Sequence, residues 1–199
     1  NITADENFNT FSLSWYNNTD VDPATGLTPY INMQKVLKVC HDFVDNFDNT
    51  FSNLLFIGQT GVGKTFLSNC IARALMDSCH SIIYLTAGEF FDSFKSDDFK
   101  EFGSSKFDTS FFVECDLLII DDLGTEKASD YNFSNLFNTI NERLLRRKSI
   151  IISSNLEMPD IETRYSQRIF SRLVSAYSIL RLFGDDIRCM KKLSPTKRS

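Results

Sequence analysis

The chain has 199 residues, of which 42% are hydrophobic and 24% are charged, and its formal net charge is −5. These values are typical of one globular α/β domain. They exclude a membrane-spanning chain, because no apolar run approaches the ~20 residues of a bilayer span. The first residues are polar and acidic, and the five cysteines show no C-x-x-C spacing, so we predict a cytoplasmic protein with reduced thiols.

The charge is unevenly distributed along the chain. Acidic residues dominate the amino-terminal part, whereas Lys and Arg outnumber Asp and Glu from Arg143 to the end. Such an asymmetry is typical of a nucleic-acid-binding surface. A solvated helix face followed by a disordered tail produces the same pattern, and we expect residues 191–199 to form such a basic tail.

Residues 1–30 lack a regular period and contain turn-forming residues, yet they include apolar side chains such as Phe11 and Trp15. We therefore predict an amino-terminal arm that packs on the domain. From residue 31 to residue 47 apolar side chains recur at helical spacing, which predicts the first helix. We place the domain itself at residues 31–190.

A regular alternation of strands and helices follows. Short, continuous apolar runs such as Leu54–Ile57 are typical of strands that are buried on both faces. Five such runs separated by helical segments predict a three-layer αβα fold around a five-stranded, mostly parallel sheet. The expected strands are 54–57, 82–85, 117–120, 150–153 and 179–183, and the expected helices after the first are 65–77, 131–147 and 160–176.

The segment from Phe90 to Phe112 is rich in phenylalanine, interleaved with Asp, Lys and Ser. This pattern favours an amphipathic helix and a loop whose aromatic rings face the core. Aromatic rings also stack on nucleic-acid bases, but acidic neighbours such as Asp97 and Glu101 argue against that role here.

Between the first strand and the next helix lies the sequence GQTGVGKT, residues 58–65. It matches the phosphate-binding pattern G-x-x-x-x-G-K-[ST] of P-loop NTPases, in the strand-to-helix context that makes this pattern specific. Its glycines let backbone N–H groups point at phosphate oxygens, and the following helix presents its positive end to the same anion. The residues expected to contact the nucleotide, ATP or ADP, are Gly58, Gln59, Thr60, Gly61, Val62, Gly63, Lys64, Thr65 and Phe66.

Four residues have distinct predicted roles in phosphoryl transfer. Lys64 places its ammonium between the β- and γ-phosphates, and Thr65 offers its hydroxyl to Mg²⁺. Asp121 and Asp122 directly follow the third expected strand, at the edge of the sheet where ligands of α/β folds bind. We expect Asp121 to hold Mg²⁺ through water. Asp122 stands where many ATPases have a Glu that orients the attacking water, and its shorter side chain predicts slow unassisted hydrolysis.

Polar residues later in the chain are further candidates for this site. Asn155 follows the fourth expected strand, where its amide can hydrogen-bond a γ-phosphate or the attacking water. Arg168, Arg172 and Arg188 each offer a planar guanidinium that can stabilise charge on a phosphoryl group. Asn is also a common turn residue, and each arginine is also compatible with an ordinary surface position.

Several of these motifs occur in one order along the chain: ENFNTFS (6–12), IGQTGVGKT (57–65), DLLIIDDLGTE (116–126), IISSNL (151–156), RIFSRL (168–173) and FGDDIR (183–188). In this combination the chain resembles the DnaC/DnaI/IstB group of AAA+ ATPases. The resemblance implies an AAA+ core without a substantial helical lid. It also implies that Gly58–Thr65 is the Walker A motif, that Asp121 and Asp122 form Walker B, and that Asn155 is sensor 1.

The same resemblance implies how the domain works. Arg172 corresponds to an arginine finger that reaches the nucleotide of a neighbouring subunit, which requires head-to-tail self-association. Arg188 corresponds to the sensor-2 arginine. The group contains loaders of the replicative helicase, which implies an ATPase of DNA replication that binds single-stranded DNA and acts on that helicase. It also contains transposition helpers, and Asp122 leaves open a nucleotide-gated binding module with little hydrolysis.

Overall fold

The structure is a computed structural model that describes residues 2–3, 5–98 and 108–193. At its centre lies a five-stranded sheet in the order β2-β3-β4-β1-β5, and every neighbouring pair in it is parallel. The predicted three-layer α/β fold is thereby confirmed. The strands are β1 (Leu54–Ile57), β2 (Ile82–Thr86), β3 (Leu117–Leu123), β4 (Ser149–Ser154) and β5 (Ser178–Arg181).

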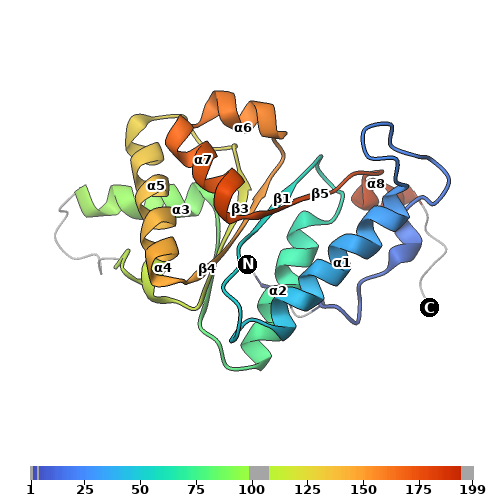
Figure 1. Ribbon diagram of the computed structural model, residues 1–199, viewed down its shortest axis with the longest axis horizontal. Helices are drawn as coiled ribbons and strands as arrows, with labels where there is room; N and C mark the ends of the chain where they lie inside the picture. The colour runs from blue at the N-terminus through green and yellow to red at the C-terminus, as the bar shows by residue number, and fades with distance from the viewer. Residues whose placement is uncertain (1, 4, 99–107, 194–199) are drawn as a thin grey trace.

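Helices cover both faces of the sheet (Figure 1). One face carries α1 (Pro29–Asp45) and α2 (Lys64–Asp77). Among the helices that the structure describes, none combines the length and apolar character that crossing a membrane requires. The opposite face carries α3 (Ala87–Asp98), α4 (Phe111–Glu114), α5 (Asp130–Arg146), α6 (Met158–Arg164) and α7 (Gln167–Ala176). The short element η1 (Leu13–Trp15) packs against α1, and α8 (Ile187–Leu193) follows β5.

Side-chain alternation in the strands divides the core into two layers. In β3, Leu117 and Ile119 pack toward α1 and α2, whereas Leu118 and Ile120 pack toward α3 and α5. All residues of the central strands β1 and β4 are buried. The two edge strands differ from our expectation of five buried strands, because each has one neighbour only. All residues of β2 are half-buried, and Ile179 of β5 is 37% exposed.

The expected helix over 160–176 is wrong, since two helices occupy this segment. Tyr165 and Ser166 adopt extended backbone conformations between α6 and α7. The Tyr165 side chain is buried, and its hydroxyl donates a hydrogen bond to Glu126 Oε1 over 2.6 Å. This long-range contact holds the chain at the break, so a helical period alone did not reveal it. The fifth strand likewise spans 178–181 instead of 179–183.

The amino-terminal arm packs against α1 and α2. The Phe8 ring lies 4.2 Å from the His41 ring of α1, and the Phe11 ring lies 5.5 Å from the Phe66 ring of α2. Helix α1 begins at Pro29, where the Thr28 hydroxyl accepts a hydrogen bond from the backbone N–H of Ile31. The arm therefore ends two residues earlier than expected.

Two other expectations concern segments that the structure describes in part. The rings of Phe90, Phe91 and Phe112 are buried in the core, which fits a packing role for the phenylalanine-rich segment. Its residues 99–107 lie outside the described part of the chain. The expected disordered tail from residue 191 is wrong for its first residues, because Lys191–Leu193 belong to α8, and residues 194–199 are not described.

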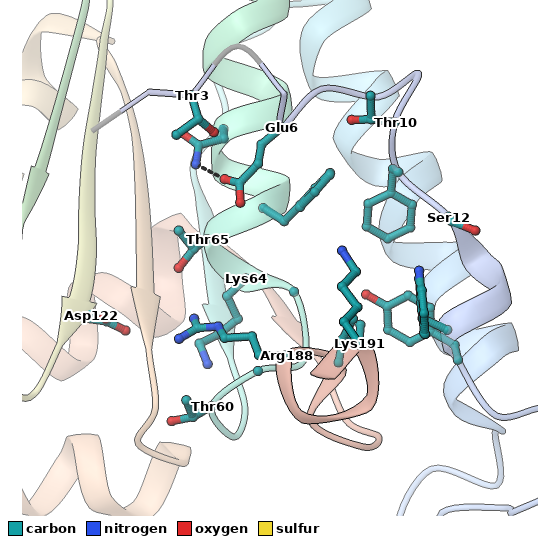
Figure 2. A pocket seen from close by; sticks show the side chains of 18 of the residues that line it. Thr3, Glu6, Thr10, Ser12, Thr60, Lys64, Thr65, Asp122, Arg188 and Lys191 are labelled. Atoms are coloured by element: carbon teal, nitrogen blue, oxygen red, sulfur yellow. Dashed lines mark hydrogen bonds between the residues drawn. The ribbon is translucent and has the colours of Figure 1, made fainter. Parts of the chain in front are cut away.

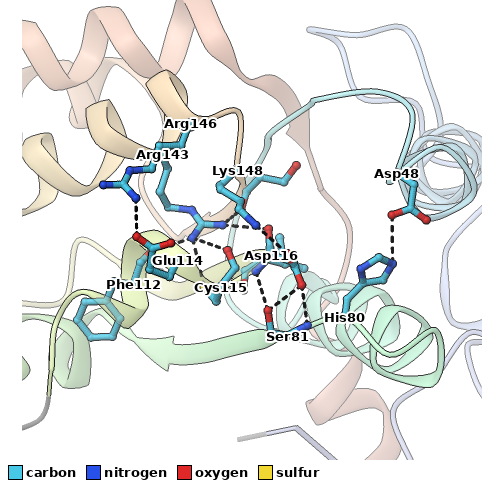
Figure 3. A network of polar contacts seen from close by, with 12 residues as sticks. Asp48, His80, Ser81, Phe112, Glu114, Cys115, Asp116, Arg143, Arg146 and Lys148 are labelled. Atoms are coloured by element: carbon cyan, nitrogen blue, oxygen red, sulfur yellow. Dashed lines mark hydrogen bonds and ion pairs between the residues drawn. The ribbon is translucent and has the colours of Figure 1, made fainter.

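Arg143, the first cation of the basic carboxyl-terminal segment, is fully buried (Figure 3). Its guanidinium donates hydrogen bonds to the backbone carbonyls of Phe112, Cys115, Asp116 and Ser149. These carbonyls lie just before β3 and at the first residue of β4, so one side chain fixes the entry of two central strands. The basic segment is therefore only partly a surface feature.

Replacing Arg143 with methionine is expected to lower the free energy of unfolding by about 3 kcal/mol or more, because three buried carbonyls and one partly buried carbonyl lose their donor. Urea denaturation measures this loss. Arg146→Met is the matched control: its partner carboxylates Glu114 and Glu142 are about half exposed, and we expect a change below about 1 kcal/mol. Equal losses in both variants would contradict the structural role of Arg143.

Candidate nucleotide site

A cavity of about 570 Å³ lies at the carboxyl ends of the central strands (Figure 2). Its walls come from the loop after β1, the first turns of α2, the ends of β3 and β4, the amino-terminal arm and α8. In parallel α/β sheets this edge is where the strand-to-helix loops converge, so residues that are distant in sequence meet here.

The glycines of the loop after β1 have positive φ angles, with 140° at Gly58, 82° at Gly61 and 106° at Gly63. Close neighbours also restrict substitution here, most strictly at Gly58, where the neighbour is backbone. A Cβ atom at Gly58 would lie 2.0 Å from the Leu182 carbonyl oxygen, and one at Gly61 would lie 2.1 Å from Asp186 Oδ1. The loop therefore needs glycine for its curvature and for its contacts with the segment after β5.

Lys64 is the first residue of α2 and is only 5% exposed. Its ammonium donates hydrogen bonds to Gly58 O (2.6 Å), Gln59 O (2.8 Å) and Asn155 Oδ1 (2.7 Å). Burial lowers the pKa of Lys64, and the nearby carboxylate of Asp122 opposes this effect. The structure thus brings the loop lysine and the amide after β4 into direct contact.

Asp121 is buried, and both of its carboxylate oxygens accept hydrogen bonds from hydroxyl groups. Oδ2 accepts from Thr65 Oγ1 (3.0 Å) and from the Tyr84 hydroxyl (2.9 Å), and Oδ1 accepts from Ser153 Oγ. Burial, followed by the charge of Asp121, raises the pKa of Tyr84, so the phenol remains a protonated donor. Thr65 and Asp121 together present hard oxygen ligands of the kind that Mg²⁺ prefers.

Asp122 does not follow the end of a strand as expected, because β3 continues through both aspartates to Leu123. The register with β4 shifts between Ile120 and Leu123, and Asp122 has a φ of 57° there. Its N–H donates to Ser153 Oγ (3.0 Å), and its Oδ1 accepts from the Asn155 amide (3.2 Å). Asp tolerates this left-handed conformation better than most residues, which gives a backbone reason for Asp instead of Glu.

The three candidate arginines lie in different places. Arg188 of α8 lines the cavity, close enough to Lys64 to lower its pKa further. Arg172 is on the exposed side of α7, where its guanidinium donates to Asn141 Oδ1 over 3.1 Å, and it does not line the cavity. Arg168, one turn earlier, is also exposed and outside the cavity.

Residues of the arm and Lys191 of α8 also line the cavity, and the sequence analysis did not place them there. The Tyr16 hydroxyl donates to Val62 O over 3.1 Å, and Trp15 borders the same space. Lys191 Nζ lies 5.7 Å from the Trp15 ring centre and 6.0 Å from that of Phe66. The apolar composition of the arm signalled packing, but no local pattern indicated that it packs beside the phosphate-binding loop.

Comparisons with known proteins agree with this geometry. Residues 31–194 match the IstB-like ATP binding protein family. The replicative helicase loader DnaC of Escherichia coli (strain K12) is 23% identical over 151 residues, which are 75% of this chain and 61% of that protein. The chain therefore spans less than two thirds of the length of this curated relative.

Two solved structures show the same fold. DnaA from Aquifex aeolicus, bound to AMPPCP, aligns with a TM-score of 0.73 at 18% identity, over 98% of this chain and 56% of that one. The crystal structure of the DnaC helicase loader aligns with a TM-score of 0.68 at 21% identity, over 86% of this chain and 96% of that one.

Proposed function

Because the chain belongs to the IstB-like ATP binding protein family, as an AAA+ ATPase domain of the DnaC/IstB type, we propose that it binds and hydrolyses ATP within a helicase loader. One observation carries this proposal. The first turn of α2 supplies Lys64 and Thr65, Asn155 directly follows β4, and β3 supplies Asp121. These side chains form two direct contacts, Lys64–Asn155 at 2.7 Å and Thr65–Asp121 at 3.0 Å.

Each residue then has a role in hydrolysis. The backbone of the Gly58–Thr65 loop and the Lys64 ammonium bind the phosphates. Thr65 and Asp121 would hold Mg²⁺, which would supply positive charge beside the phosphates. Asp122, held by the Asn155 amide, accepts a hydrogen bond from the attacking water. The water oxygen adds to the γ-phosphorus, and the bond between the γ-phosphorus and the oxygen that bridges it to the β-phosphate breaks. The products are ADP and phosphate.

The active site is completed by a second copy of the chain in this proposal. Arg172 is exposed and lies outside its own cavity, which suits a finger that acts on a neighbour. Arg188 lies inside its own cavity, which suits contact with the nucleotide of the same chain. A head-to-tail interface of this kind generates a ring or a helical filament.

The partners in this proposal are single-stranded DNA and the replicative helicase. The similarity to a replicative helicase loader supports the helicase as a partner. Exposed cations such as Arg146, Arg147 and Arg168 support binding of an anionic polymer such as DNA. Five free cysteines support a reducing compartment such as the cytoplasm.

Binding of single-stranded DNA tests this function. With ATP and Mg²⁺, alone or with its helicase, the chain is expected to bind single-stranded DNA at low salt and to release it steeply as salt rises. Fluorescence anisotropy of a labelled oligonucleotide over a salt series measures this dependence, with ADP as the comparison nucleotide. An absence of binding at low salt in every condition would contradict the loader proposal.

Two other functions share the same ATP site. The family match favours an IstB-like transposition helper, and a transposase gene beside this gene, instead of replication genes, would support it. The left-handed Asp122 favours a nucleotide-gated binding module with little hydrolysis. A single-turnover assay separates that module from an ATPase, because bound ATP would then persist instead of becoming ADP.

A further inference from the structure

Tyr84 lies in the edge strand β2 with its side chain on the same face of the sheet as Asp121. In the parallel register Tyr84 is opposite Ile119 of β3, and Thr86 is opposite Asp121. Because side chains at positions two apart share one face, the Tyr84 ring extends diagonally toward Asp121. The phenol is therefore directed along the sheet to the candidate metal site.

The hydroxyl of Tyr84 reaches the same carboxylate oxygen as Thr65. Tyr84 donates to Asp121 Oδ2 over 2.9 Å, and Thr65 Oγ1 donates to that oxygen over 3.0 Å. The direct neighbour in the register cannot replace this contact, because the Thr86 hydroxyl donates to Glu89 Oε2 over 2.9 Å. Tyr84 is thus the residue of β2 that orients Asp121 among the described contacts.

We propose that Tyr84 is a positioning residue for Asp121, holding its carboxylate toward Thr65 and thereby strengthening Mg²⁺ binding at the ATP site. This inference rests on the proposed function, since it concerns the metal that accompanies ATP. Ser153 Oγ donates to the other carboxylate oxygen, Asp121 Oδ1. Hydroxyl donors therefore hold both oxygens, which limits rotation of the carboxylate. Such second-layer hydrogen bonds change metal affinity or activity by about 10- to 100-fold in known metal sites.

A phenol suits this position better than a charged donor. It is neutral, so it orients the carboxylate and leaves the full negative charge available to a divalent cation. A Lys or Arg at residue 84 would form an ion pair with Asp121 and repel the metal. The ring also belongs to the apolar layer between the sheet and α2, so a purely structural role of Tyr84 is the alternative that an experiment must separate.

Tyr84→Phe removes the hydroxyl and keeps the ring. The affinity for ATP is measured with and without Mg²⁺ through the fluorescence of Trp15, which is the only tryptophan of the chain and lines the cavity. We expect the half-saturating Mg²⁺ concentration to rise by about 10-fold, whereas ATP affinity in EDTA stays unchanged. Tyr131→Phe is the matched control, because the Tyr131 hydroxyl donates to Phe94 O on the other side of the sheet.

Each alternative outcome has a clear meaning. If ATP binding by the parent chain depends on Mg²⁺ and the half-saturating Mg²⁺ concentration is unchanged in Tyr84→Phe, this inference is overturned. The proposed function is then left intact. Equal losses of ATP affinity with and without Mg²⁺ overturn it as well, since they indicate a structural role. A parent chain whose ATP affinity does not depend on Mg²⁺ overturns both the inference and the proposed metal role of Thr65 and Asp121.

Discussion

Replacing Lys64 with alanine is expected to weaken ATP binding by about 100-fold or more. The change removes the buried ammonium that pairs with the negatively charged phosphates of ATP. The structure indicates a second contribution to this loss. The ammonium is held by three oxygens, those of Gly58, Gln59 and Asn155. In the variant these oxygens would face the phosphates without the intervening cation, so repulsion is added to the lost attraction.

Isothermal titration with ATP measures this effect, and thermal unfolding without nucleotide shows whether the variant is folded. Lys148→Ala serves as the control, because Lys148 pairs with Asp116 at the opposite edge of the sheet. ATP binding that survives in Lys64→Ala would contradict the site assignment.

Arg172→Ala is expected to lower the turnover of the assembled protein by about a thousandfold and to leave ATP affinity unchanged, because an arginine finger acts on the transition state of a neighbour. Within its own chain the Arg172 guanidinium donates a hydrogen bond to Asn141 Oδ1 over 3.1 Å. Asn141→Ala removes that contact and keeps the arginine, so its turnover is expected to remain normal. Arg168→Ala tests the exposed arginine one turn away.

Mixing two inactive variants tests whether Arg172 acts between subunits. A subunit with Lys64→Ala retains Arg172, and a subunit with Arg172→Ala retains a complete phosphate-binding loop. Their mixture is expected to recover part of the ATPase activity, which a phosphate-release assay detects. Normal turnover of Arg172→Ala alone would contradict the finger assignment, and a mixture without activity would contradict its action in trans.

The elements of this fold that depend on local sequence patterns could be predicted from the sequence. Apolar runs such as Leu54–Ile57 identified the strands, because burial on both faces leaves no polar position in them. The phosphate-binding loop was identified for a similar reason, since its chemistry needs adjacent residues in a fixed order. Its contacts with Asp121 and Asn155 followed from the rule that the carboxyl ends of parallel strands share one edge.

The features that were missed depend on partners distant in sequence. Helices α6 and α7 separate at Tyr165, because its hydroxyl is held by Glu126 on another segment. Tyr84 reads as an ordinary strand residue until the register with β3 places it diagonally to Asp121. Lys191 read as part of a tail, although α8 carries it to the cavity. No local periodicity or motif predicts contacts between residues that are so distant in sequence.

The cavity wall has a practical consequence for how the domain is delimited. The arm and α8 come from opposite ends of the sequence, and Trp15 and Lys191 meet across the same space. The family match begins at residue 31, so a fragment cut at that boundary would keep the predicted site residues from Gly58 to Arg188 and lose Phe11, Trp15 and Tyr16. In the intact chain a ligand that fills the cavity would contact residues of the arm and of α8 at once, so its binding would link these two segments.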